Sequence, residues 1–222
     1  MLEFMSFLEQ SYEDHADVEC AYSMSKYMRN QFAFYGIQTP LRRRLQRLCL
    51  QQIALPSISQ LINIIQFCYA KPQREWQYFA CDLTTNSLLT KEFIQIIEFM
   101  ITQKSWWDTV DTIATKIIGQ LVRDNPILIK KMDKWIDSEN FWLQRSAILY
   151  QLRYKQATDV DRLFLYCTQL ANSKEFFIQK AIGWALREYS KTDATAVQQF
   201  VATQPLAKLS QREALKWLHT HT

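Results

Sequence analysis

The chain has 222 residues, of which only three are glycine and five are proline, so it lacks the residues that tight turns between strands require. This composition argues against an all-β architecture. Hydrophobic residues make up 48 % of the chain and aromatic residues 14 %, and a chain of this length buries roughly 70 % of its unfolded surface, which excludes a disordered state. The net charge of +4 is mild, so binding to a polyanion would have to come from one charged face.

The sequence carries no signal for a membrane or for an oxidising compartment. No segment approaches the ~18 uncharged apolar residues of a membrane helix, and the first residues, MLEFMSFLEQSYED, lack the basic region of a signal peptide. Five cysteines are widely spaced among apolar residues, with only three histidines in the chain. We therefore expect a soluble intracellular protein without a disulfide framework, a structural metal or a cofactor.

Helical periodicity dominates the chain. Apolar residues recur at helical spacing, as in residues 61–68, and we expect about a dozen helices of ~10 to 17 residues with short links. Thr39 and Asn125 each precede a proline, which predicts an N-cap followed by proline at the first helical position. Ser210 and Glu213 have the spacing of a capping box.

The longest segment without helical spacing covers residues 30–39. It contains Gly36 and several aromatic residues at positions where an exposed loop would be polar. We expect this segment to fold back onto the helices. The basic residues Arg42, Arg43 and Arg44 follow it, but runs of this kind are common on solvated helices and indicate little alone.

Five short motifs end in alanine at a nearly constant spacing. The motifs EWQYFA, DTIA, LQRSA, IQKA and QREA end at Ala80, Ala114, Ala147, Ala181 and Ala214, with successive differences of 34, 33, 34 and 33. This period fits a hairpin of two helices in which a small residue permits close helix approach. We predict an all-α fold, an α-solenoid of HEAT-like repeats, in a single domain over residues 1–222. Chance alanines in an ordinary helical bundle remain the alternative.

The segment KSWWDTVD is the most informative in the chain. If Ser105 is an N-cap, Asp108 completes a capping box, whereas Asp111 has no such structural role. Trp106 shares a stripe with apolar residues, and Trp107 lies about 100° around the helix, one turn before Asp111. A ring beside a carboxylate suits a cationic ligand. Alternatively, Asp111 pairs with a basic residue of a neighbouring helix and Trp107 is packing.

A basic stripe that contains a tryptophan appears two repeats later. It has the spacing i, i+4, i+7 and i+11 and comprises Lys180, Trp184, Arg187 and Lys191. If the hairpins stack in register, Arg145 and Asp111 share one concave surface with this stripe, and Asp111 is its isolated acid. Such a surface suits phosphates and the flat faces of sugars or bases. A solvated surface stripe is the alternative.

Several catalytic motifs are absent from the sequence. The chain contains no GxxxxGK[ST], GxGxxG, HExxH or GxSxG motif. Nucleotide-dependent, zinc-hydrolase and serine-hydrolase chemistry therefore have no support.

Five segments together identify a family. KYMRNQFAFYGIQTPLRRR, REWQYFACDL, KSWWDTVD, WLQRSAILYQL and FFIQKAIGWALREYSK resemble the AlkD-like family of bacterial DNA alkylation-repair enzymes. The resemblance extends nearly from end to end, and WWDTVD and GWALREYSK are specific to it. It implies a solenoid of HEAT-like repeats that holds duplex DNA and excises positively charged alkylated bases, such as N3-methyladenine and N7-methylguanine.

The resemblance also assigns site residues. By motif, the family's catalytic aspartate falls on Asp111, and its two active-site tryptophans fall on Trp107 and Trp184. Two backbone-contacting arginines fall on Arg145 and Arg187. With the two lysines of the stripe and two residues of the N-terminal segments, the predicted DNA-binding set is Arg145, Arg187, Lys180, Lys191, Tyr27 and Gln38.

Three hypotheses follow from the sequence. The first is a monofunctional DNA glycosylase that acts as a monomer on double-stranded DNA in the bacterial cytoplasm, associated with the nucleoid and without an obligate protein partner. The second is a catalytically silent DNA-structure binder on the same scaffold. The third is a HEAT-like protein-interaction scaffold. Asp111 separates the first hypothesis from the second, and the basic face separates both from the third.

Overall fold

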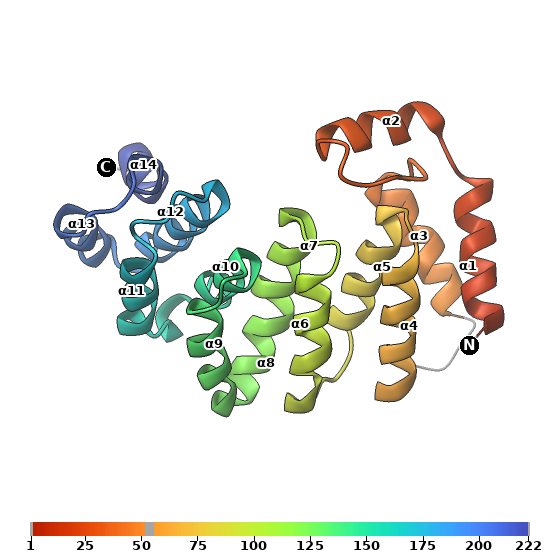
Figure 1. Ribbon diagram of the computed structural model, residues 1–222, viewed down its shortest axis with the longest axis horizontal. Helices are drawn as coiled ribbons and strands as arrows, with labels where there is room; N and C mark the ends of the chain where they lie inside the picture. Colours follow the sequence, from red (N-terminus) through yellow and green to blue (C-terminus); the bar gives the residue numbers. More distant parts are fainter. Residues whose placement is uncertain (1, 52–55, 222) are drawn as a thin grey trace. The chain divides into compact units, whose positions relative to one another are not determined.

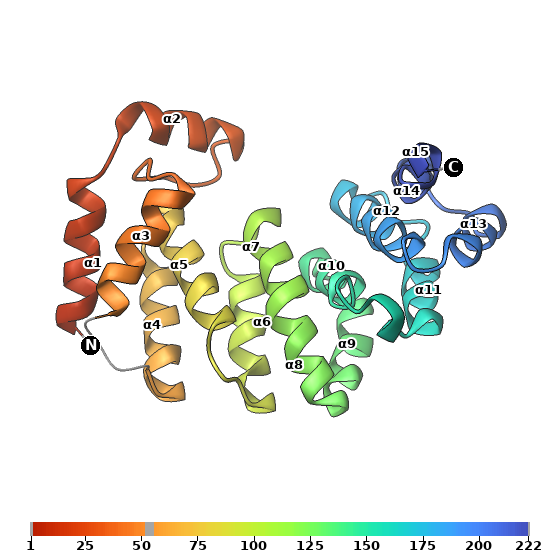
Figure 2. The ribbon, with the colours of Figure 1, turned by 180° about the vertical axis from the view of Figure 1, so that it is seen from behind.

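A computed structural model describes residues 2–51 and 56–221 (Figures 1 and 2). These residues form helices and connecting loops, and their β-type pairing is confined to one isolated bridge between Ala33 and Gln73. The predicted all-α fold is confirmed. Within the described part of the chain, no helix has the length and apolar character needed to cross a membrane.

The chain divides into two compact units, Met1–Leu88 and Leu89–Thr222. Each is described separately, and the expectation of a single domain over residues 1–222 stays a prediction.

The described residues of the first unit form five helices. They are α1 (Leu2–Asp14), α2 (Val18–Tyr27), α3 (Thr39–Leu50), α4 (Ile58–Ala70) and α5 (Arg74–Thr85). Helix α1 packs against α3, and α4 packs against α5, while α2 lies across one end of this group (Figures 1 and 2). Its core contains the fully buried Trp76 ring, which meets the Tyr12 ring edge-on with centroids 5.1 Å apart.

The loop of residues 28–38 folds back onto α5, as its aromatic residues predict. The buried Glu75 carboxylate accepts hydrogen bonds from the backbone N–H groups of Tyr35, Gly36 and Ile37 at 3.1, 2.9 and 3.2 Å. Burial raises the pKa of Glu75, and these hydrogen bonds oppose that rise. Gly36 has φ +90°, and a Cβ there would lie 2.0 Å from the Asp17 carbonyl oxygen, so only glycine fits.

The second unit contains the remaining elements. They are η1 (Lys91–Phe93), α6 (Ile94–Thr102), α7 (Trp107–Thr112), η2 (Ile113–Ile118), α8 (Gly119–Asp124), η3 (Pro126–Leu128), α9 (Ile129–Ile136), α10 (Phe141–Leu149), η4 (Lys155–Ala157), α11 (Val160–Gln169), α12 (Phe176–Ser190), α13 (Ala194–Thr203), α14 (Lys208–Leu215) and α15 (Leu218–His221). Helix α10 contacts η2 on one side and α12 on the other, and α12 in turn contacts α14. Hairpins thus follow one another in chain order, as in HEAT-like repeats.

The repeating alanines mark these helix contacts. Ala80 in the first unit, and Ala114, Ala147, Ala181 and Ala214 in the second, all have a relative exposure of 0 %. Each of the last four lies on the second helical segment of a hairpin, in η2, α10, α12 or α14. Small side chains at these positions permit the close approach that the period of 33 or 34 residues predicts.

Helix starts differ in part from the sequence expectations. Asn125 is the N-cap before Pro126, as expected, but Gln38 rather than Thr39 is the N-cap of α3. Both predicted capping boxes are wrong. Ser105 donates to the carbonyl of Ile101 while Trp106 is the N-cap of α7, and Ser210 lies inside α14, which begins at Lys208.

The five cysteines are free thiols, and four of them, Cys49, Cys68, Cys81 and Cys167, are buried. Cys20 is half-buried near Asp17, which raises its pKa through a side-chain hydrogen bond. Burial raises the pKa of Cys49 to about 11, and raises those of Cys68 and Cys167 as well.

The packing at Gly119 generates a stability prediction. A Cβ at this position would lie 2.6 Å from the Tyr150 carbonyl oxygen, a backbone atom that cannot rotate away. We expect Gly119→Ala to lower the free energy of unfolding by about 1–3 kcal/mol, the usual range for overpacking, although alanine is the better helix former by about 1 kcal/mol. Urea unfolding would measure the change. Gln120→Ala, at the exposed neighbouring position, should be nearly neutral, and a Gly119→Ala variant as stable as the parent would contradict the prediction.

Candidate functional site

A pocket of about 300 Å³ opens in the second unit. Trp107 and Asp111 contribute to it from α7, one helical turn apart, as their spacing predicts. The remaining lining residues come from α10, α12 and α14 and are Arg145, Phe176, Phe177, Lys180, Trp184, Arg187 and Glu213. All three residues predicted as catalytic, Asp111, Trp107 and Trp184, therefore line one pocket.

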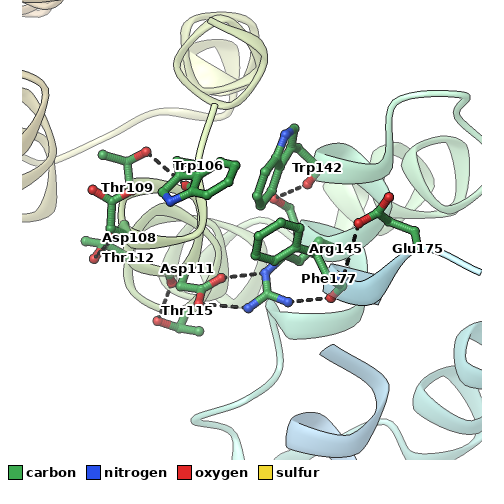
Figure 3. Close-up of polar contacts among 11 residues, drawn as sticks. Trp106, Asp108, Thr109, Asp111, Thr112, Thr115, Trp142, Arg145, Glu175 and Phe177 are labelled. Atoms are coloured by element: carbon green, nitrogen blue, oxygen red, sulfur yellow. Dashed lines mark hydrogen bonds and ion pairs between the residues drawn. The ribbon is translucent and has the colours of Figure 1, made fainter. Parts of the chain in front are cut away.

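The Asp111 carboxylate forms a two-point ion pair with Arg145 (Figure 3). Nε of Arg145 donates to Oδ1 at 2.7 Å, and Nη2 donates to Oδ2 at 2.8 Å. The Asp111 side chain is 16 % exposed and that of Arg145 is 5 % exposed. A parallel pair of charge-assisted hydrogen bonds is strong and directional, so the carboxylate is fixed in its plane.

Arg145 has a third partner in the next hairpin. Its Nη1 donates to the carbonyl oxygen of Phe177 in α12 at 2.5 Å (Figure 3). This buried guanidinium is thus committed to protein partners at Nε, Nη1 and Nη2. These bonds make Arg145 the residue that orients Asp111, and because Arg145 also lines the pocket, its predicted contact with the DNA backbone stays a prediction. The alternative role considered for Asp111 was pairing with a basic residue of a neighbouring helix. The structure contains this pairing, with Arg145 as the partner.

Burial raises the pKa of Asp111 above its usual value, and the hydrogen bonds and charge of Arg145 oppose that rise. The carboxylate therefore takes up a proton at a higher pH than a solvated aspartate does. Asp108 on the same helix adds a small effect in the same direction.

A π-helical segment directly follows α7, the helix that carries Asp111. Residues Ile113–Ile118 form η2, and the N–H of Gly119 donates to the carbonyl of Ala114, five residues earlier. The Thr115 hydroxyl donates to the Asp111 carbonyl oxygen at 2.7 Å. π-helical turns inside α-helices occur often at functional sites, but nothing in the apolar spacing of this segment signals the extra residue.

Trp106 and Trp107 serve different surfaces, as predicted from their positions on the helix. Trp106 packs against Trp142 and Phe177, with ring centroids 6.0 and 5.2 Å apart (Figure 3). Trp107 instead lines the pocket. The Trp106 cluster supports the pocket, and Trp107 forms part of its wall.

The sequence reasoning missed three lining residues, Phe176, Phe177 and Glu213, of which Glu213 is the charged one. Its Oε1 lies 3.1 Å from Nζ of Lys180, and its Oε2 lies 2.9 Å from Nη1 of Arg187. Asp111 is therefore not the isolated acid of the basic face, and that prediction is wrong. The spacing of Glu213 from Ser210 had suggested a capping box, whereas a carboxylate 33 residues after Lys180, close to the repeat period, was the signal that could have found it.

Three of the predicted DNA-binding residues lie outside this pocket. Lys191 is the C-cap of α12 and pairs with Glu188 at 2.6 Å. Tyr27, the last residue of α2, is 71 % exposed, and Gln38 is exposed at the N-cap of α3. Both belong to the first unit. In the described part of the chain, no three His, Cys, Asp or Glu residues are grouped so that they could hold a metal ion.

Comparison with known proteins places this chain in a family. The model of a family described as DNA alkylation repair enzyme matches residues 8–218. A solved structure described as a predicted DNA alkylation repair enzyme from Enterococcus faecalis is 35 % identical, with 91 % of this chain and 96 % of that chain covered and a TM-score of 0.84. The search of curated proteins found no match. The chain belongs to the DNA alkylation repair enzyme family, which gives it a role in the repair of alkylated DNA.

The buried ion pair generates a stability prediction that is independent of function. We expect Arg145→Met to lower the free energy of unfolding by about 3–5 kcal/mol, because it leaves the Asp111 carboxylate buried without its partner. Urea unfolding followed by tryptophan fluorescence would measure this loss. The double variant Asp111→Asn/Arg145→Met should recover a large part of it, and purely additive losses would show that the two residues do not act as a pair.

Proposed function

We propose that the protein is a monofunctional DNA glycosylase that releases positively charged alkylpurines, such as N3-methyladenine and N7-methylguanine, from duplex DNA. One observation carries the proposal: a fixed carboxylate, Asp111, lines the same pocket as the two tryptophans Trp107 and Trp184. Family membership supports DNA as the partner.

The proposed substrate determines what the site must do. Alkylation at a ring nitrogen leaves a positive charge on the purine, so the base departs neutral when the N-glycosidic electron pair moves onto it. No general acid is needed to protonate it. The developing positive charge lies on the deoxyribose, and that charge is what the protein has to stabilise.

Asp111 meets this requirement. Its negative charge stabilises the sugar cation as the bond to the base lengthens, and it orients a water molecule toward C1′ of the sugar. Water forms the new C–O bond, and its proton passes to the carboxylate or to solvent. Since Arg145 holds both carboxylate oxygens, little reorientation is needed during the reaction.

The tryptophans and the remaining cations complete the proposed site. Trp107 and Trp184 offer flat faces that contact the deoxyribose and attract positive charge. Lys180 and Arg187, which line the pocket from α12, bind a neighbouring phosphate. Lys191, and Tyr27 and Gln38 in the first unit, are further proposed contacts with DNA.

A catalytically silent DNA-binding protein is the second candidate, because the ion pair with Arg145 gives Asp111 a structural role. Replacing the charge of Asp111 while keeping its shape separates the two candidates.

We expect Asp111→Asn to reduce base release from methylated duplex DNA by at least about a hundredfold, because it removes the charge that stabilises the sugar cation. Chromatography of free N7-methylguanine would measure release, and fluorescence anisotropy should show that DNA binding is retained. Asp108→Asn, which makes the same change on the same helix outside the pocket lining, is the matched control. Equal release by Asp111→Asn and the parent protein would refute the catalytic role and favour the silent binder.

The pKa of Asp111 predicts a pH dependence. Since the ionised carboxylate is the active form and burial raises its pKa, the single-turnover rate should fall as pH is lowered, at a midpoint above the ~3.9 of an ordinary aspartate. Single-turnover release across the acidic range, corrected for spontaneous loss of the base, would measure this midpoint. A rate that stays constant down to the range of an ordinary aspartate would contradict the assignment.

A further inference from the structure

We propose that Glu213 is a specificity-determining residue that occupies, in the free protein, the position of a DNA phosphate between Lys180 and Arg187. The inference rests on the proposed function, because it concerns how the same pocket engages DNA. It assigns the carboxylate the role of an internal competitor that keeps these two cations from undamaged duplex.

The geometry of Glu213 is that of a bound oxyanion. Each of its two oxygens faces a different cation, Lys180 at 3.1 Å and Arg187 at 2.9 Å. A phosphate presents its oxygens to lysine and arginine in the same way, through charge-assisted hydrogen bonds. The Glu213 side chain is 13 % exposed, while those of Lys180 and Arg187 are 37 % and 26 % exposed, so the cations remain within reach of an incoming ligand.

The packing of α14 holds Glu213 in this position. The Cβ atom of Glu213 lies close to α12, and a Cβ atom added at Gly183 would be 2.4 Å from it. Glycine at position 183 therefore leaves the room that the Glu213 side chain occupies. The Ser210 hydroxyl also donates to the Gln179 carbonyl oxygen at 2.9 Å, which ties α14 to α12 one turn before Glu213. The backbone of Glu213 is therefore fixed, and the carboxylate can release the cations by side-chain rotation alone.

The charge of Glu213 is present at all times near neutral pH. Burial alone would raise its pKa, but Lys180 and Arg187, helped by Lys216, outweigh that effect and hold the pKa below its usual value. A phosphate must therefore displace an ionised carboxylate before it can bind both cations.

A phosphate displaces the Glu213 carboxylate from the two cations only where a second attraction also holds the DNA in the pocket. A nucleotide with a cationic base is drawn to Asp111 in the same pocket, which brings its flanking phosphate toward Lys180 and Arg187. An undamaged nucleotide has no such positive charge. On undamaged duplex the two cations stay with Glu213, and they pass to the phosphate only when the lesion occupies the pocket.

The test is the binding of undamaged duplex by Glu213→Gln, which keeps the shape of the side chain and removes its charge. We expect Kd for undamaged duplex to fall about tenfold, and the slope of log K against log salt to steepen by about 0.9 for each cation that newly contacts a phosphate. In the base-release assay, undamaged duplex should become a stronger competitor. Fluorescence anisotropy across a salt series measures the first two quantities.

Two further variants separate this role from a general charge effect. Glu98→Gln makes the same change in net charge, because it removes a carboxylate that is paired with Lys131. Glu98 lies outside the pocket lining, so the salt slope of this variant should match that of the parent. In a Lys180→Gln/Arg187→Gln background, Glu213→Gln should change affinity no more than Glu98→Gln does, because the two cations that Glu213 pairs with are absent.

The outcomes distinguish this inference from the proposed function. If the parent protein binds duplex and Glu213→Gln has the parent's Kd and salt slope, the inference about Glu213 is overturned. The proposed glycosylase function does not depend on that result and stands. If the parent releases no methylated base but Glu213→Gln still tightens and steepens binding, the proposed function fails and the competitor role stands. A parent protein that does not bind duplex overturns both.

Discussion

The ion pair between Asp111 and Arg145 is the interaction on which the site depends, because it joins three successive hairpins at one point. Asp111 comes from α7, Arg145 from α10, and the carbonyl that receives the third guanidinium bond from α12. Taking two charges out of water is costly, and the pair repays that cost only because its geometry is close to ideal. What the protein obtains is a carboxylate with a fixed direction beside the rings of Trp107 and Trp184.

The repeat explains why charges meet in this way. Asp111 and Arg145 are 34 residues apart, and Lys180 and Glu213 are 33 apart, so each pair links residues close to the repeating alanines of neighbouring hairpins. The fully buried alanines bring those helices close enough for side chains one to three residues before them to touch. A spacing close to the repeat period thus produces a buried pair that orients a proposed catalytic group and a more exposed pair that lines the same pocket.

Sequence reasoning predicted which face of a helix a residue lies on, because helical spacing determines that. It did not predict which side chains pair across neighbouring helices, because that depends on the distance between the helices. The different surroundings of Trp106 and Trp107, the convergence of Asp111 with Trp184, and the return of residues 30–39 onto the helices follow from spacing and composition. The partners of Arg145 and Glu213 do not, because an exposed arginine and a buried one look the same in a sequence. The π-helical turn after Asp111 is invisible for a similar reason, since one extra residue per turn leaves an apolar segment apolar.

The burial of the cysteines has a consequence for a protein with a role in the repair of alkylated DNA. Agents that methylate DNA also methylate thiolates, and the thiolate is the reactive form of cysteine. Four of the five thiols are buried, and the pKa is raised at Cys20, Cys49, Cys68 and Cys167, so at neutral pH these sulfurs remain largely protonated. These thiols are therefore less open to attack by such electrophiles than solvent-exposed cysteines with an ordinary pKa would be.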